Sequence, residues 1–231
     1  MKSIVRKPEF IFFDGGDVLF NRKTPDGDNI ARELGFDPAQ YDQIVQETIK
    51  TQSNKEVQEF NQIKTLEDEY RIINRFHEYM CRYLGVAYDD VLINKLTEYR
   101  IKADFELKSN VLKTIQSLAP LYRLGLLSNA LPSRRFHEFK IDNLDSFFEF
   151  AVLSWEEGIQ KPDPAIFKIA IQKSGVSPDK ILFVDNKVKY LEGAQTAGID
   201  NLVLVNVDHT SEDYTSINDL YELVTILNEL A

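Results

Sequence analysis

Five short runs rich in apolar residues recur along the chain, and they are largely without the polar alternation of a strand that faces water on one side. They span residues 10–13, 124–127, 148–153, 181–184 and 202–205. Strands that are buried on both faces have this pattern, because helices cover both sides of a parallel sheet. The five runs therefore predict five strands of a parallel sheet.

Helical patterns separate these runs in the second half of the chain. Asp163 precedes a proline at the first helical position, and Gly175 ends the same pattern. A second helix is expected over residues 188–197. A C-terminal helix is indicated by apolar residues at helical spacing, which are Ile217, Leu220, Tyr221, Val224 and Leu227. Strands that alternate with helices predict an α/β fold of the doubly wound type.

Residues 21–102 differ from the rest because they contain no convincing strand. Their helix-start signals are Asp37, Ser53, Thr65 and either Asp89 or Asp90. An all-helical block thus interrupts the α/β part directly after its first strand. An insertion at that point lies at the carboxyl edge of the sheet, where open α/β sheets bind ligands.

Composition narrows the classes of partner. The 231 residues include 27 Lys and Arg against 37 Asp and Glu, a formal net charge of −10. A broadly basic surface for nucleic acid is therefore not expected. The single Cys81 excludes a disulfide within the chain and a cysteine-rich zinc site. No run approaches the roughly 20 apolar residues of a membrane span, so we expect a cytoplasmic protein without a membrane partner. Oligomeric state is not readable from the sequence.

Polar residues with catalytic chemistry follow three of the predicted strands. Asp14 follows the first, Ser128 and Asn129 follow the second, and Asp185 follows the fourth. Lys161 stands just before the helix that opens at Asp163. Because parallel strands end at one edge of a sheet, we expect these side chains to lie together.

This set of residue types favours phosphoryl transfer. Asp14 and Asp185 can hold Mg²⁺, which prefers oxygen ligands. The Lys161 ammonium and the Ser128 and Asn129 donors would neutralise the oxygens of a phosphate. Asp14 would then attack phosphorus and form an aspartyl-phosphate.

The chain resembles the haloacid dehalogenase-like hydrolase superfamily, in particular the members with a helical cap after the first motif. Its four motifs are matched in order at Asp14, Ser128, Lys161 and Asp185. The resemblance implies a Rossmann-like core over about residues 1–20 and 103–231, with a helical cap over about 21–102. It also implies Mg²⁺-dependent hydrolysis of small phosphorylated metabolites, with Asp14 and Lys161 as catalytic residues. The implied phosphate-binding residues are Ser128, Asn129 and Lys161, and the implied metal contacts are Asp14, the Gly16 carbonyl and Asp185.

Three positions depart from the family pattern. Gly16 replaces the second Asp of the first motif, which serves as general acid and base, and Asp17 follows it. Asp17 could substitute only if the double glycine turns it inward. Asn186 replaces the second Asp of the fourth motif, where it could still bind a metal-bound water. Tyr190 stands where an Asn is common, with no consequence that the sequence reveals.

Three hypotheses follow from these residues. The first is an Mg²⁺-dependent phosphatase that prefers esters with good leaving groups, because Gly16 cannot donate a proton. The second is a catalytically impaired protein that binds a phospho-ligand or a protein partner, since both Gly16 and Asn186 depart from the pattern. The third, ranked behind these, is a metal-independent 2-haloacid dehalogenase with the same Asp14 nucleophile.

Overall fold

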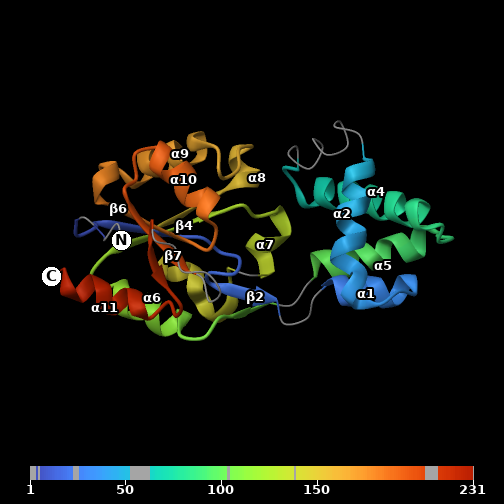
Figure 1. Cartoon of the computed structure of the whole chain (residues 1–231), viewed down its shortest axis with the longest axis horizontal. Helices are drawn as coiled ribbons and strands as arrows, with labels where there is room; N and C mark the ends of the chain where they lie inside the picture. Colours follow the sequence, from blue (N-terminus) through green and yellow to red (C-terminus); the bar gives the residue numbers. More distant parts are fainter. Residues whose placement is uncertain are drawn as a thin grey trace. The chain divides into compact units, whose positions relative to one another are not determined.

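The computed structural model describes residues 4, 6–22, 26–52, 63–102, 105–137, 139–205 and 213–230. These residues form two compact units (Figure 1). The sheet unit is made of residues 1–21, 106–130 and 138–231, and the helical unit is made of residues 22–105 and 131–137.

The sheet unit is built on six parallel strands. Their order across the sheet is β5 (Phe150–Leu153), β4 (Arg123–Ser128), β1 (Phe10–Phe13), β6 (Ile181–Asp185), β7 (Asn201–Val205) and β8 (Thr215–Ile217). All five apolar runs of the sequence are strands of this sheet, so the predicted parallel α/β fold is confirmed. Phe10, Phe12 and Phe13 of the central β1 are fully buried, as expected for a strand covered on both faces.

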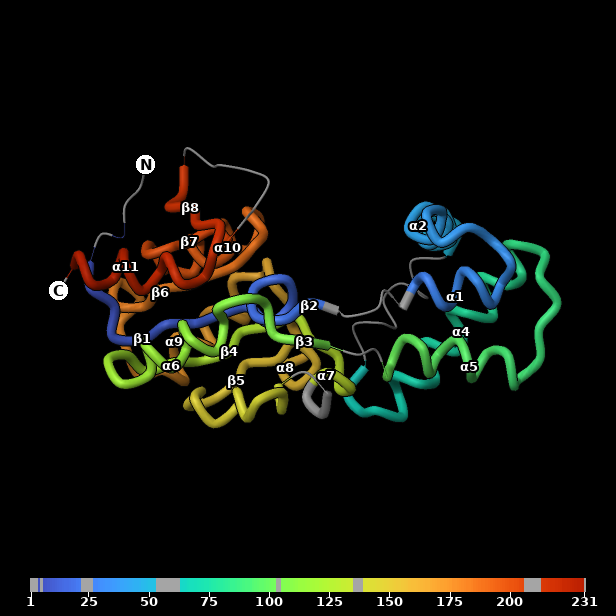
Figure 2. Tube along the Cα trace, turned by 90° about the horizontal axis from the view of Figure 1, so that it is seen from below, coloured from blue at the N-terminus to red at the C-terminus, as the bar shows by residue number. Residues whose placement is uncertain are grey.

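Helices cover both faces of this sheet (Figures 1 and 2). One face carries α9 (Pro164–Ser174) and α10 (Val188–Thr196), and the other carries α6 (Val111–Leu118) and α11 (Glu222–Glu229). The short α8 (Ser154–Glu157) follows β5, and the 3₁₀ segments are η3 (Ile141–Phe147) and η4 (Pro178–Lys180). The Asp163 side chain accepts a hydrogen bond from the Ala165 N–H, so the predicted start of α9 is confirmed.

The predicted C-terminal helix begins later than the apolar spacing indicated. Ile217 belongs to β8, and α11 starts only at Glu222. The Glu222 carboxylate accepts the N–H groups of Asn218 and Asp219, and the Asp219 carboxylate accepts that of Tyr221. These hydrogen bonds satisfy a turn between strand and helix, and a helix through this segment would lose them.

The helical unit contains α1 (Asp26–Leu34), η1 (Pro38–Gln40), α2 (Tyr41–Thr51), α4 (Leu66–Leu84), α5 (Asp90–Ile101) and α7 (Pro132–His137). The predicted helix starts at Asp37, Thr65 and Asp89 are confirmed, since each side chain accepts a hydrogen bond from its own helix. Ser53 lies outside the described residues. The core of this unit includes fully buried Cys81, consistent with its role as a small hydrophobic residue.

Two short strands flank the insertion and were not expected from the sequence. They are β2 (Phe20–Arg22) and β3 (Phe105–Leu107), which form a separate two-stranded sheet. Each has three residues, too few for a readable apolar run. No helix within the described residues is both long and apolar enough to cross a membrane.

Candidate active site

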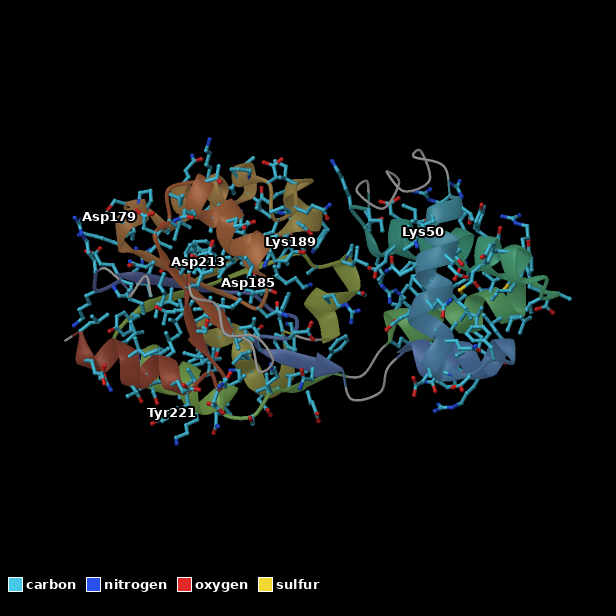
Figure 3. All side chains as sticks on the ribbon, in the orientation of Figure 1. Lys50, Asp179, Asp185, Lys189, Asp213 and Tyr221 are labelled. Atoms are coloured by element: carbon cyan, nitrogen blue, oxygen red, sulfur yellow. The ribbon has the colours of Figure 1, made fainter. Side chains whose placement is uncertain are left out.

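Asp14, Lys161 and Asp185 form one buried cluster in the sheet unit. Phe13 is paired with Val184 across β1 and β6, so the residues that follow, Asp14 and Asp185, emerge side by side at the carboxyl edge. The Lys161 Nζ lies 2.9 Å from Asp14 Oδ1 and 2.6 Å from Asp185 Oδ2. Figure 3 labels Asp185 at this end of β6. The sequence therefore correctly anticipated that these three residues meet.

The electrostatics of the cluster are dominated by burial. Burial raises the pKa of Asp185 to about 6; the Lys161 ammonium lowers it, and the Asp14 carboxylate adds to the rise. Burial lowers the pKa of Lys161, but the two carboxylates outweigh this effect and hold it above its ordinary value. Lys161 therefore stays charged, and it is shared between two acids.

Asn129 fixes the backbone of Lys161. Its Nδ2 donates to the Lys161 carbonyl at 2.9 Å, and its Oδ1 accepts the Lys161 N–H at 2.8 Å. Ser128 is buried at the end of β4, where its hydroxyl would lie 3.1 Å from a Cβ added at Gly15. The structure thus brings both predicted phosphate-binding residues of this motif to the same strand edge as Asp14.

The loop after Asp14 is held by backbone hydrogen bonds. The Asp17 N–H donates to the Phe20 carbonyl at 2.9 Å, and the Asp17 carbonyl accepts from Lys108 Nζ at 2.6 Å. Asp17 is exposed and adopts a left-handed conformation with φ of 61°. Gly16 is exposed too, and a Cβ added to it would have no atom within 4 Å.

The donor set at the carboxyl edge fits Mg²⁺. No three His, Cys, Asp or Glu side chains cluster within the described residues. Magnesium needs only one or two carboxylates because it retains several waters. The Asn186 Oδ1, next to Asp185, is buried and has no hydrogen-bond partner in the described part of the chain. Such an oxygen suits a metal-bound water.

The sequence assigned no role to one residue that contacts the cluster, which is Tyr190. The Tyr190 ring centroid lies 4.8 Å from the Lys161 Nζ. The sequence offered one signal, namely that Tyr190 departs from the family pattern, but no spacing rule connects it to Lys161.

A parallel α/β core with a buried Asp–Lys–Asp cluster at its carboxyl edge defines a class of proteins with an active site at the ends of the strands. A family model described as haloacid dehalogenase-like hydrolase matches residues 28–204. The chain belongs to this family of hydrolases, and the resemblance noted in its motifs is confirmed. The match includes Ser128, Lys161 and Asp185 but begins after Asp14.

One relative and two solved structures are similar to this chain, the structures in fold. The chain is 32% identical over 117 residues to a glyceraldehyde 3-phosphate phosphatase of Methanothermobacter thermautotrophicus, which is 46% of this chain and 51% of that protein. The match thus spans about half the length of that relative. A dehalogenase structure with an intermediate complex has a TM-score of 0.70 at 19% identity, covering 96% and 98% of the two chains. A hydrolase structure from Bacillus subtilis bound to magnesium has a TM-score of 0.65 at 17% identity, covering 96% and 100%.

Proposed function

We propose that the protein is a Mg²⁺-dependent phosphatase that hydrolyses a small phosphorylated metabolite through an aspartyl-phosphate. The observation that carries the proposal is the Lys161 ammonium, buried within hydrogen-bond distance of both Asp14 and Asp185. The similarity to a glyceraldehyde 3-phosphate phosphatase supports the same substrate class.

The charge of the cluster supports a requirement for a metal. One ammonium and two carboxylates sum to −1, which repels a phosphate dianion. Mg²⁺ held by Asp14, Asp185 and the Gly16 carbonyl would make the sum +1 and supply positive charge to the phosphate oxygens. A hydrolase of similar fold has been solved with bound magnesium, which supports the choice of this metal.

The chain's own residues supply the remaining chemistry. A carboxylate oxygen of Asp14 forms a bond to phosphorus while the bond from phosphorus to the ester oxygen breaks. Lys161 and Ser128 stabilise the phosphate oxygens in the transition state, joined by the backbone N–H of Asn129, because both side-chain donors of Asn129 already bind the Lys161 carbonyl and the Tyr190 hydroxyl. Water then attacks phosphorus, which releases inorganic phosphate and restores the Asp14 carboxylate. Closure of the helical unit, acting as a cap, would exclude bulk water and select the substrate.

Gly16 sets the expected substrate preference. The leaving oxygen needs a proton when its conjugate acid is weak, and Gly16 has no side chain to donate one. We therefore propose that the enzyme favours esters whose leaving groups need no proton. The exposed Asp17 is the nearest alternative acid in sequence, and Asn186 would hold a metal-bound water.

The test is hydrolysis of an activated aryl phosphate by the wild type and by Asp14→Asn, with Mg²⁺ and with EDTA. We expect turnover that is lost in the variant and in EDTA. Tight binding of inorganic phosphate without turnover would favour the impaired binding protein instead. Turnover of a 2-haloacid that survives EDTA would favour a dehalogenase instead.

A further inference from the structure

Tyr190 connects the two ends of Lys161. It lies in the first turn of α10 and is 9% exposed. Its ring faces the Lys161 ammonium at 4.8 Å, and its hydroxyl lies 3.4 Å from the Asn129 Nδ2. Because Asn129 holds the Lys161 backbone, Tyr190 touches both the charged end of the lysine and the group that fixes its main chain.

The contact with the ammonium matters because that group is fully buried. An ammonium that has lost its water gains from an aromatic face, and the gain is larger than at an exposed site. Asp14 and Asp185 accept two of the three hydrogen bonds that the Nζ can donate, and the Tyr190 ring supplies a second kind of contact. Phe183 adds a more distant ring at 5.3 Å.

The hydroxyl of Tyr190 acts on the other end of Lys161. The Asn129 amide has two N–H donors, and its bond to the Lys161 carbonyl uses one. The Tyr190 hydroxyl accepts from the same nitrogen, which favours one orientation of the amide. That orientation also leaves the Asn129 oxygen facing the Lys161 N–H.

Two further lysines lie by the same ring, and their exposure separates their effect from that of Lys161. Lys187 and Lys189 have their Nζ atoms 5.5 and 5.2 Å from the Tyr190 centroid, and both residues are exposed. Figure 3 labels Lys189 on α10. Exposed cation–π contacts contribute little compared with desolvated ones, so the buried contact to Lys161 should dominate.

We propose that Tyr190 is a positioning residue that holds the Lys161 ammonium where it binds phosphate. The proposal rests on the proposed function, in which Lys161 contacts the phosphate of the substrate. The proposal also explains what the departure from the family pattern does at this position. The Asn of that pattern has no aromatic face, whereas Tyr190 offers one to the Lys161 ammonium.

The test compares three variants for binding of inorganic phosphate in the presence of Mg²⁺, by titration calorimetry. Tyr190→Leu removes the ring, and we expect phosphate binding to weaken about 10- to 30-fold. Tyr190→Phe keeps the ring, and we expect a change of no more than about threefold. Tyr214→Leu is the matched control, since Tyr214 is 7% exposed in the same hydrophobic cluster. It should bind phosphate like the wild type.

Urea unfolding and turnover of the same variants separate a positioning role from a loss of stability. The urea midpoints of the two leucine variants should be similar. The weaker phosphate binding of Tyr190→Leu then cannot be attributed to a loss of stability, because Tyr214→Leu loses a buried tyrosine as well. The kcat/KM for an aryl phosphate should fall with phosphate affinity in Tyr190→Leu alone. Equal loss of binding in both leucine variants, or a loss in Tyr190→Phe as large as in Tyr190→Leu, would overturn the proposal. Phosphate binding that weakens only in Tyr190→Leu, in a wild type that shows no turnover, would refute the proposed phosphatase but support the positioning role.

Discussion

Substitution of Gly16 by Asp tests whether a missing general acid limits this enzyme. The site accepts the change, because a Cβ at Gly16 would have no atom within 4 Å and its φ lies outside the left-handed region. The loop contact nearest to it, the bridge to Phe20, involves only the backbone. We therefore expect Gly16→Asp to fold without measurable strain.

The expected gain depends on the leaving group. General acid catalysis contributes about 10²- to 10⁴-fold, or about 2.7 to 5.4 kcal/mol of activation free energy. An alkyl phosphate, whose leaving oxygen must be protonated, should be hydrolysed faster by Gly16→Asp by up to this factor. An activated aryl phosphate should change little, since its leaving group departs as an anion.

The assay is kcat/KM across a series of phosphate esters with rising leaving-group pKa. The wild type should show a steep fall along the series, and Gly16→Asp should show a shallower one. Gly16→Asn matches the size of the new side chain but cannot donate a proton, and it should retain the steep fall. The reasoning is refuted if the wild-type dependence is flat, or if the Asp and Asn variants behave alike. A loss on alkyl phosphates in Asp17→Asn would identify Asp17 as the acid already present.

Two further predictions concern buried contacts. Glu69 is 1% exposed and accepts from the Ser133 N–H at 2.8 Å and hydroxyl at 2.7 Å. Glu69→Ala should therefore lower the free energy of unfolding by about 2–5 kcal/mol in urea titrations, and Ser133→Ala by less, because it leaves the N–H bond intact. A Cβ at Gly193 would lie 2.3 Å from the Pro162 carbonyl oxygen, so Gly193→Ala should lower the free energy of unfolding by about 1–3 kcal/mol. It should also displace the neighbouring Lys161, which would be measured as a lower kcat/KM. An unchanged urea midpoint would contradict this prediction.

The strands of the sheet were predictable because burial on both faces leaves a continuous apolar run. Phe10–Phe13 is such a run, and it coincides with β1. The three-residue strands were not predictable because they contain no continuous run of buried apolar residues. Thr215–Ile217 has one buried residue, and its strand conformation depends on pairing with β7, which is a tertiary property.

The residues at the strand ends were predictable because topology alone brings them together. Tyr190 and Glu69 were not, because their roles depend on which side chain each one faces. Helical spacing in α4 emphasised apolar positions and passed over Glu69, which is fully buried beside Ser133. A carboxylate in a helix normally indicates solvent, so only its contacts reveal the exception.

Charge at the site leads to a final prediction about metal removal. The sequence suggested that a metal, Lys161 and the donors of Ser128 and Asn129 together supply the charge that a phosphate needs. In the structure the Lys161 ammonium is shared by Asp14 and Asp185, and the three groups sum to −1. Inorganic phosphate should therefore bind the wild type with Mg²⁺ and hardly at all in EDTA.

Asp185→Asn removes one negative charge with little change in shape and brings the sum of charges in the cluster to zero. Unit charges 4 Å apart interact by about 4 kcal/mol at an effective dielectric constant of about 20. In EDTA the variant should thus bind phosphate at least about tenfold more tightly than the wild type, even though it should lose activity with Mg²⁺. Calorimetry of both proteins under both conditions decides the matter, and equal binding by both in EDTA would show that the charge of the cluster does not control access of the anion.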